Sequence, residues 1–156
     1  MRVPLWILLS AVGGPQEEAA RLAAEVFALE PVDPARALAS LDRALALAPR
    51  DPGVLKAGLY LHLRLRDLAA AEDAGRALLE VGGADPYAWI WLGNIAFWRR
   101  DLDEAEKRYH QALESAGPGS TAEDAKAKLA QIADERAYRA RAGVLARRSL
   151  ALGGLA

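Results

Sequence analysis

The feature that most constrains this chain is an internal repeat with a step of 34 residues. Asp33, Asp67 and Asp101 lie at that spacing, and Pro52 and Pro86 share it. A fixed period of this length indicates stacked copies of one small helical or mixed unit, each burying its apolar face against the next copy. Apolar positions follow the same step at Ala37, Ala71 and Ala105 and at Leu45, Leu79 and Leu113.

Aspartates mark the places where helices should begin. An aspartate before the first helical residue accepts the free backbone N–H groups, and proline at the first position loses no hydrogen bond. Asp67 and Asp101 predict two further starts, and Ser120 with Glu123 has the spacing of a capping box. Aspartate and proline stand together at Asp33-Pro34, Asp51-Pro52 and Asp85-Pro86.

No stretch shows the two-residue alternation of a strand, so the prediction is an all-α chain. Breaks at Pro49, at Gly82-Gly83 and at Gly117-Pro118-Gly119 separate the helices. The predicted helices span about 16–29, 34–48, 52–65, 68–81, 86–99, 102–116 and 121–150.

The third unit carries the most specific motif. Trp89, Leu92 and Gly93 are followed by Ala105 and Tyr109, a spacing that resembles the W-x2-L-G…A-x3-F signature of the tetratricopeptide repeat. The resemblance implies a right-handed α-solenoid of helix-turn-helix repeats with a C-terminal capping helix. It divides the chain into an apolar segment 1–14, a repeat domain 15–150 with repeats 18–51, 52–85 and 86–119 and a capping helix 121–150, and a tail 151–156.

Small residues in the repeats predict close helix contacts. Gly93 and Ala105 should mark one where two backbones approach. The second repeat departs from the motif, because Gly75 stands where the family has a large ring. Since protein interiors keep few voids, we expect a large neighbour, with Trp89 as the first candidate, to fill that space.

The resemblance also implies where a partner would bind, because in this family the first helix of each repeat lines a concave groove. Rings on such a wall bury a large area at low entropic cost, and an asparagine can bond to a peptide backbone. Relatives that grip a terminal carboxylate use lysine, arginine and asparagine, and only Lys56 and Asn94 stand at matching places. The alternative is that the rings pack against the chain's own terminal segments. The predicted partner-binding residues are Lys56, Tyr60, Arg64, Tyr87, Trp91, Asn94 and Trp98.

Composition argues against several other functions. The 156 residues hold 20 basic and 21 acidic side chains, so bulk charge gives no case for nucleic acid. There is no cysteine, and the two histidines, His62 and His110, lie in different repeats. No phosphate-binding glycine loop or Ser-His-acid motif occurs. We therefore predict no enzyme activity, no metal and no cofactor.

Both ends of the chain have features of segments that contact a membrane or another protein. Residues 1–14 combine Arg2, an apolar run and small residues, which outlines a signal peptide, an anchor or a docking segment. An ordinary apolar segment covering the end of the stack is the alternative. The run is shorter than the roughly 20 residues that span a bilayer. The C-terminal stretch after Glu135 has no acid and could contact anionic lipid or an acidic partner, or be a solvated face; its arginines are Arg136, Arg139, Arg141, Arg147 and Arg148.

The sequence therefore predicts a non-catalytic protein–protein interaction module that holds a peptide or chain segment in an aromatic and basic groove. The alternative is a structural or assembly subunit of a larger, membrane-associated complex, docked through its two ends. The short array also favours self-association. A bacterial cell-envelope location, periplasmic or membrane-associated, is slightly favoured over a cytoplasmic one.

Overall fold

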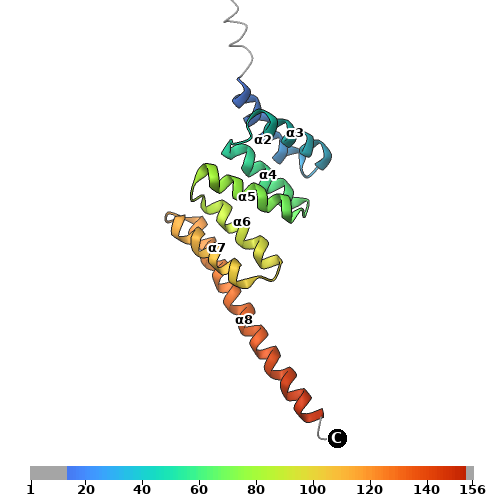
Figure 1. Ribbon diagram of the computed structural model, residues 1–156, viewed down its shortest axis with the longest axis vertical. Coiled ribbons are helices and arrows are strands. Elements are labelled where there is room, and N and C mark those ends of the chain that lie inside the picture. The colour runs from blue at the N-terminus through green and yellow to red at the C-terminus, as the bar shows by residue number, and fades with distance from the viewer. Residues whose placement is uncertain (1–13, 154–156) are drawn as a thin grey trace, which may run out of the picture.

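The computed structural model describes residues 14–153, and within them the chain forms seven helices in a row with no strand (Figure 1). Residues 1–13, all but the last residue of the predicted N-terminal segment 1–14, lie outside the described part, as do residues 154–156. None of the helices described is both long and apolar enough to cross a membrane. The helices are α2 (Pro15–Leu29), α3 (Pro34–Leu47), α4 (Pro52–Arg64), α5 (Leu68–Gly82), α6 (Pro86–Trp98), α7 (Leu102–Ser115) and α8 (Ser120–Gly153).

The aspartate signals for helix starts are confirmed. Each of the five side chains accepts a hydrogen bond from a backbone N–H in the first turn of α3 to α7, and the one before α6 accepts two. The capping-box prediction is wrong in its register. Helix α8 begins at Ser120 itself, one residue before the predicted start, so Ser120 lies in the first turn and not before it. The five caps are Asp33, Asp51, Asp67, Asp85 and Asp101.

The turns inside the second and third repeats are identical in construction. After α4, Arg66 takes a left-handed conformation with φ 62°, and after α6 Arg100 does so with φ 68°. The amide of Arg66 donates to the carbonyl of Leu63 at 3.2 Å, and that of Asp67 donates to His62 at 2.9 Å. This pattern is a Schellman motif, which satisfies the last carbonyls of one helix while the aspartate caps the next.

The core is a chain of clusters, each shared by successive helices. Leu22, Leu41 and Leu61 join α2, α3 and α4 in the first cluster. Leu59, Leu78 and Leu92 join α4, α5 and α6 in the second. Two further clusters join α6 and α7 to α8. Because each cluster connects neighbours only, the fold is a solenoid in which repeats are held together in sequence order.

The structure refines one prediction about small residues and corrects the other. A Cβ at Gly93 would lie 2.5 Å from the Tyr109 ring, so Gly93 leaves room for that ring where α6 and α7 pack closely. At Gly75 the nearest atom would be the Leu92 Cδ2, at 3.0 Å. Leu92 therefore fills the space that we assigned to Trp89. Trp89 instead packs beneath the guanidinium of Arg108, whose central carbon is 5.2 Å from the ring centroid.

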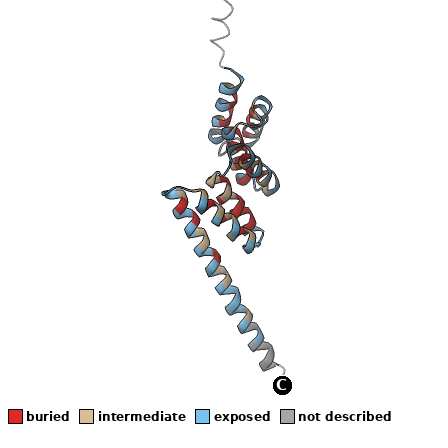
Figure 2. Cartoon of the chain, turned by 60° about the vertical axis from the view of Figure 1, so that its left-hand side comes forward, coloured by how far each residue is buried: buried red, intermediate tan, exposed pale blue. Residues whose placement is uncertain are grey.

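Helix α8 covers the end of the stack and then continues beyond it (Figures 1 and 2). Its first half buries Ala125 and Ile132 against α6 and α7. Arg136 then bonds to Glu106 at 2.8 Å and also pairs with Asp103 on α7. After Arg136 the described side chains are almost all exposed, as Figure 2 shows.

Candidate partner-binding face

Five aromatic side chains from α2, α4 and α6 form what we call the aromatic face. The rings of Phe27 and Tyr60 lie 4.9 Å apart. Tyr87 meets Trp91 edge-on at 6.0 Å, and Trp91 lies 6.5 Å from Trp98. Phe27 and Trp98 keep 44% and 42% of their surface exposed, and the other three rings are half-buried. Partly exposed rings at contact distance form a surface on which a ligand can stack.

Cations from α4 and from the turn after it lie against the rings of α6. The Lys56 Nζ lies 2.7 Å from the Asp85 carboxylate and 5.9 Å from the Tyr87 ring centroid. The guanidinium carbon of Arg66 lies 5.8 Å from the Trp98 ring centroid. These contacts place the second repeat's cations along the edge of the third repeat's rings. They hold the rings through cation–π attraction, which is worth about 0.5–1 kcal/mol at exposed sites.

Glu30 organises the other end of the aromatic face. Its buried carboxylate accepts a hydrogen bond from the Tyr60 hydroxyl at 3.1 Å and from Arg64 Nε at 2.9 Å. Loss of solvent around the hydroxyl, with the bond to Glu30, raises the pKa of Tyr60 above its usual value. Tyr60 is therefore a neutral hydrogen-bond donor at neutral pH, and the charge of Arg64 is balanced within the protein.

Asn94 is the one predicted residue that the structure places in the interior. Its side chain is only 7% exposed, and its Oδ1 accepts a hydrogen bond from the Tyr109 hydroxyl at 2.8 Å. Burial raises the pKa of Tyr109, so this hydroxyl keeps its proton. The bond orients the ring that occupies the space beside Gly93. Asn94 therefore supports the aromatic face from the protein interior, whereas we predicted that it would lie on the outward-facing stripe of α6.

A hollow of about 420 Å³ adjoins the aromatic face between α6 and α8. Rings and aliphatic carbon line it on the α6 side, and hydroxyl and charged groups line it on the α8 side. This mixture suits a ligand that buries apolar surface and also forms hydrogen bonds. The lining residues are Tyr87, Ile90, Trp91, Asn94, Ser120, Thr121, Asp124 and Lys128.

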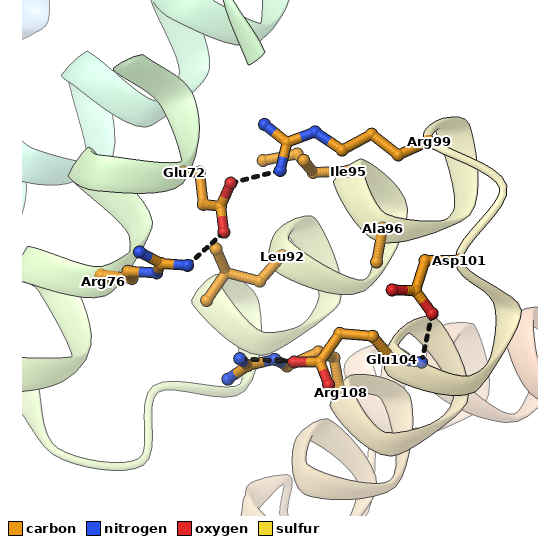
Figure 3. A pocket seen from close by; sticks show the side chains of 9 residues that line it. All are labelled: Glu72, Arg76, Leu92, Ile95, Ala96, Arg99, Asp101, Glu104 and Arg108. Atoms are coloured by element: carbon orange, nitrogen blue, oxygen red, sulfur yellow. Dashed lines mark hydrogen bonds and ion pairs between the residues drawn. The ribbon is translucent and has the colours of Figure 1, made fainter. Parts of the chain in front are cut away.

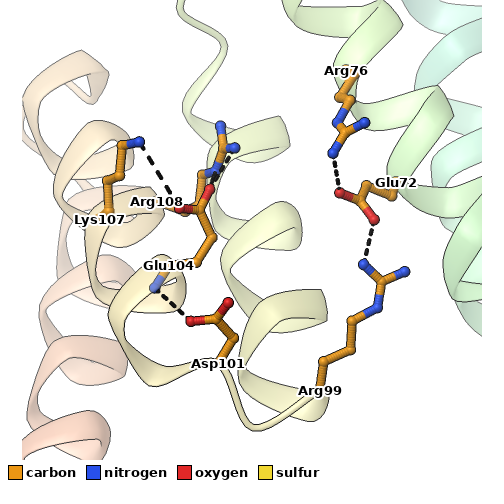
Figure 4. A network of polar contacts seen from close by, with 7 residues as sticks. All are labelled: Glu72, Arg76, Arg99, Asp101, Glu104, Lys107 and Arg108. Carbon is orange, nitrogen blue, oxygen red and sulfur yellow. Dashed lines mark hydrogen bonds and ion pairs between the residues drawn. The ribbon is translucent and has the colours of Figure 1, made fainter.

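A second hollow, of about 390 Å³, lies where α5, α6 and α7 meet (Figure 3). Glu72 pairs there with Arg76 and Arg99, and Glu104 pairs with Arg108 (Figure 4). Burial raises the pKa of Glu72, but the bond to Arg99 and the surrounding guanidinium charges outweigh burial and lower it overall. Because every arginine in this hollow already has a carboxylate partner, we assign the cluster to holding α5 and α6 together.

The structure brings six of the seven predicted residues to one face, and the seventh, Asn94, is nearly buried and lines the adjoining hollow. The sequence-based reasoning missed Phe27, Arg66 and the α8 side of the hollow. Phe27 could have been found, because it lies off the packing stripe of Leu22 and Val26 in α2. Arg66 gave no such signal, since its position depends on the left-handed turn. The residues that share the face are Lys56, Tyr60, Arg64, Tyr87, Trp91 and Trp98.

Comparison with known proteins identifies the fold. No protein-family model and no curated protein matches the chain. Among solved structures it is similar to the first TPR domain of Spaghetti (RPAP3) bound to the HSP90 peptide SRMEEVD, with a TM-score of 0.68 at 20% identity, covering 78% of this chain and 95% of that domain. The solution structure of the first TPR domain of human RPAP3 gives a TM-score of 0.70 at 20% identity, covering 82% and 98%. The Sgt2 TPR domain from Aspergillus fumigatus gives 0.71 at 22% identity, covering 82% and 85%.

Proposed function

The chain has the tetratricopeptide-repeat fold, and we propose that its aromatic face and the adjoining hollow bind an extended segment of a partner protein without catalysing a reaction. The observation that carries the proposal is the group of five partly exposed rings on successive first helices. Rings of this kind supply most of the energy in protein–protein contacts, because they bury large area at low entropic cost. The similar RPAP3 domain was solved with a bound peptide, which supports a peptide as the kind of ligand.

The pairing of charges on this face indicates what the ligand contacts. Lys56 is held by Asp85 and Arg64 by Glu30, at 2.7 Å and 2.9 Å. A ligand carboxylate would have to compete with these carboxylates for its cation. We therefore propose that apolar and aromatic side chains of the partner provide most of the affinity. Binding should then depend only weakly on salt, since screening acts on charge pairs and not on apolar burial.

The test begins with a peptide selected against the purified protein from a random library, so that the ligand has a known sequence. Its affinity is measured by titration for the wild type and for Trp91→Ala combined with Trp98→Ala. We expect the double variant to bind about thirtyfold more weakly or worse, because truncating a central ring commonly costs about 2 kcal/mol or more. Circular dichroism confirms that both proteins are folded.

Tyr138→Ala is the matched control, because Tyr138 is a ring with 69% of its surface exposed that lies on α8 outside the face. Its affinity should equal that of the wild type. Equal affinities for the double variant and the wild type would move the site away from the aromatic face. Failure of the wild type to select any peptide would favour the structural-subunit alternative.

A further inference from the structure

The outer half of α8, residues 137–153, forms a surface that the repeat stack does not use. The inner half packs through Ala125, Leu129 and Ile132. The C-terminal part of the helix extends away from the other helices (Figure 1). Tyr138 and Leu145 are 69% and 65% exposed there.

These exposed residues form a stripe on the side of the helix opposite the packing face. With 3.6 residues per turn, Tyr138, Ala142 and Leu145 share one side, whose centre lies roughly 140° around the helix from that of Leu129 and Ile132. In the sequence Ala146, Ser149 and Leu152 continue the same sector. It is about 120° wide and contains no charged residue, as in an amphipathic helix. The stripe therefore does not continue the contact with the stack.

Arginines border this stripe on both edges. Arg139 falls at one edge and Arg141 at the other, and the sequence adds Arg148 beside Arg141. Arg139 is bonded to Glu135 at 2.9 Å, whereas no ion pair of Arg141 or Arg147 occurs within residues 14–153. No acidic residue follows Glu135 in the sequence. Two copies joined through this stripe would bring like charges together, which disfavours a dimer as its occupant.

We propose that the outer half of α8 lies along an anionic lipid surface, with its stripe among the upper acyl chains and its arginines among the headgroups. A charge-free apolar sector flanked by cations on both sides fits an interfacial helix. Arginine can bury its aliphatic stem beside the stripe while its guanidinium reaches phosphate groups. A tyrosine such as Tyr138 is favoured at the same depth, because its ring is apolar and its hydroxyl is not. This proposal is independent of peptide binding by the aromatic face.

The first experiment is flotation of the full chain with vesicles of neutral phosphatidylcholine or of phosphatidylcholine with phosphatidylglycerol. We expect binding to the anionic vesicles that weakens as salt rises. Arg139→Gln with Arg141→Gln, which removes one exposed cation from each edge of the stripe, should reduce partitioning about tenfold or more, given the contribution of each cation near a charged membrane. Arg36→Gln with Arg50→Gln is the matched control on the repeats, where both arginines are exposed, and it should not change binding.

A second pair of variants tests the contact of the apolar stripe with the acyl chains. Tyr138→Ser with Leu145→Ser should also lower partitioning about tenfold or more, because the buried apolar area is lost. Val32→Ser removes an apolar side chain that is 81% exposed in the loop after α2 and should have no effect. All these positions are exposed, so circular dichroism should show unchanged helicity in every variant.

A site-specific probe separates α8 from residues 1–13, which are also apolar. The chain has no cysteine, so Leu145→Cys and Val32→Cys each accept one environment-sensitive dye. Anionic vesicles should shift the emission to the blue at position 145 and not at position 32. Unchanged binding of both α8 double variants, or equal binding to neutral vesicles, would overturn the proposal. Absence of vesicle binding together with salt-sensitive binding to polyglutamate would instead identify an acidic protein as the partner.

Discussion

Three buried glycines in the repeats differ in the space beside them, and this difference predicts opposite effects of the same substitution. At Gly58 an added Cβ would lie 3.5 Å from the Leu41 Cδ1, an ordinary contact. At Gly75 it would lie 3.0 Å from Leu92, and at Gly93 it would lie 2.5 Å from Tyr109. The substitution to alanine should therefore become more unfavourable in that order.

The magnitudes follow from two opposing terms. Alanine in place of a helical glycine gains about 0.5–1 kcal/mol, because the unfolded chain loses freedom. At Gly58 this gain is unopposed. At Gly93 the added carbon is about 1 Å too close to the ring for normal contact, and overpacking costs about 1–3 kcal/mol. Since the Tyr109 ring is buried and its hydroxyl is bonded to Asn94, we take the upper end of that range. The net expectation is a loss of about 2 kcal/mol for Gly93→Ala and little change for Gly75→Ala.

Urea and thermal unfolding followed by circular dichroism measure the effect. For a chain of this size about 2 kcal/mol corresponds to roughly 4–8 °C in Tm. In the background Tyr109→Leu, which removes the ring, Gly93→Ala should no longer destabilise the protein, and the coupling between the two changes isolates the contact. If Gly93→Ala were as stable as Gly58→Ala, Gly93 would not be the site of close packing, and the argument from the ring would be wrong.

Three other substitutions test individual contacts. Glu72→Gln should lower the free energy of unfolding by up to about 1 kcal/mol near pH 7. Because the pKa of Glu72 in the folded protein is below its ordinary 4.5, this stabilisation is present above pH 4.5 and is lost as the pH falls through the folded pKa. Urea midpoints of wild type and variant, measured at several pH values, should therefore converge in acid. A difference in midpoint that stays constant with pH would contradict this. Asp85→Ala should cost about 1–2 kcal/mol and more than Asp101→Ala, since the former caps two N–H groups and also pairs with a lysine of α4; thermal melts of the two variants decide the order. Tyr109→Phe should cost about 1–3 kcal/mol, because the buried Asn94 oxygen loses its donor, and unchanged stability would mean that the bond contributes nothing.

Helix boundaries were largely predictable from the sequence because their causes are local. A capping oxygen such as that of Asp101 accepts a hydrogen bond from an N–H only three residues later. Both partners therefore lie in one short stretch of sequence. The left-handed Arg66 and Arg100 are also local, yet they were missed because glycine is the residue expected at such turns. The register of α8 was missed by one residue, where the Ser120 pattern fits a cap that the helix does not use.

The partner-binding face was only partly predictable, because its chemistry depends on pairs from different repeats. The spacing of Trp91 and Trp98 placed both rings on one side of α6, which the structure bears out. The ion pairs of Lys56 with Asp85 and of Arg64 with Glu30 join residues that lie about one repeat apart in the sequence. Such a contact requires the rotation and separation of two neighbouring helices, which periodicity does not specify.

The sequence by itself determined the repeat, the helices and the side of each helix that carries rings, because these depend on spacing along one chain segment. Only the tertiary structure decided that Leu92 fills the space at Gly75 and that Asn94 turns inward to Tyr109. It also decided that the outer half of α8 leaves the stack (Figure 2). The physical reason is that packing between helices is set by how their surfaces interlock, and several arrangements are compatible with the same apolar pattern.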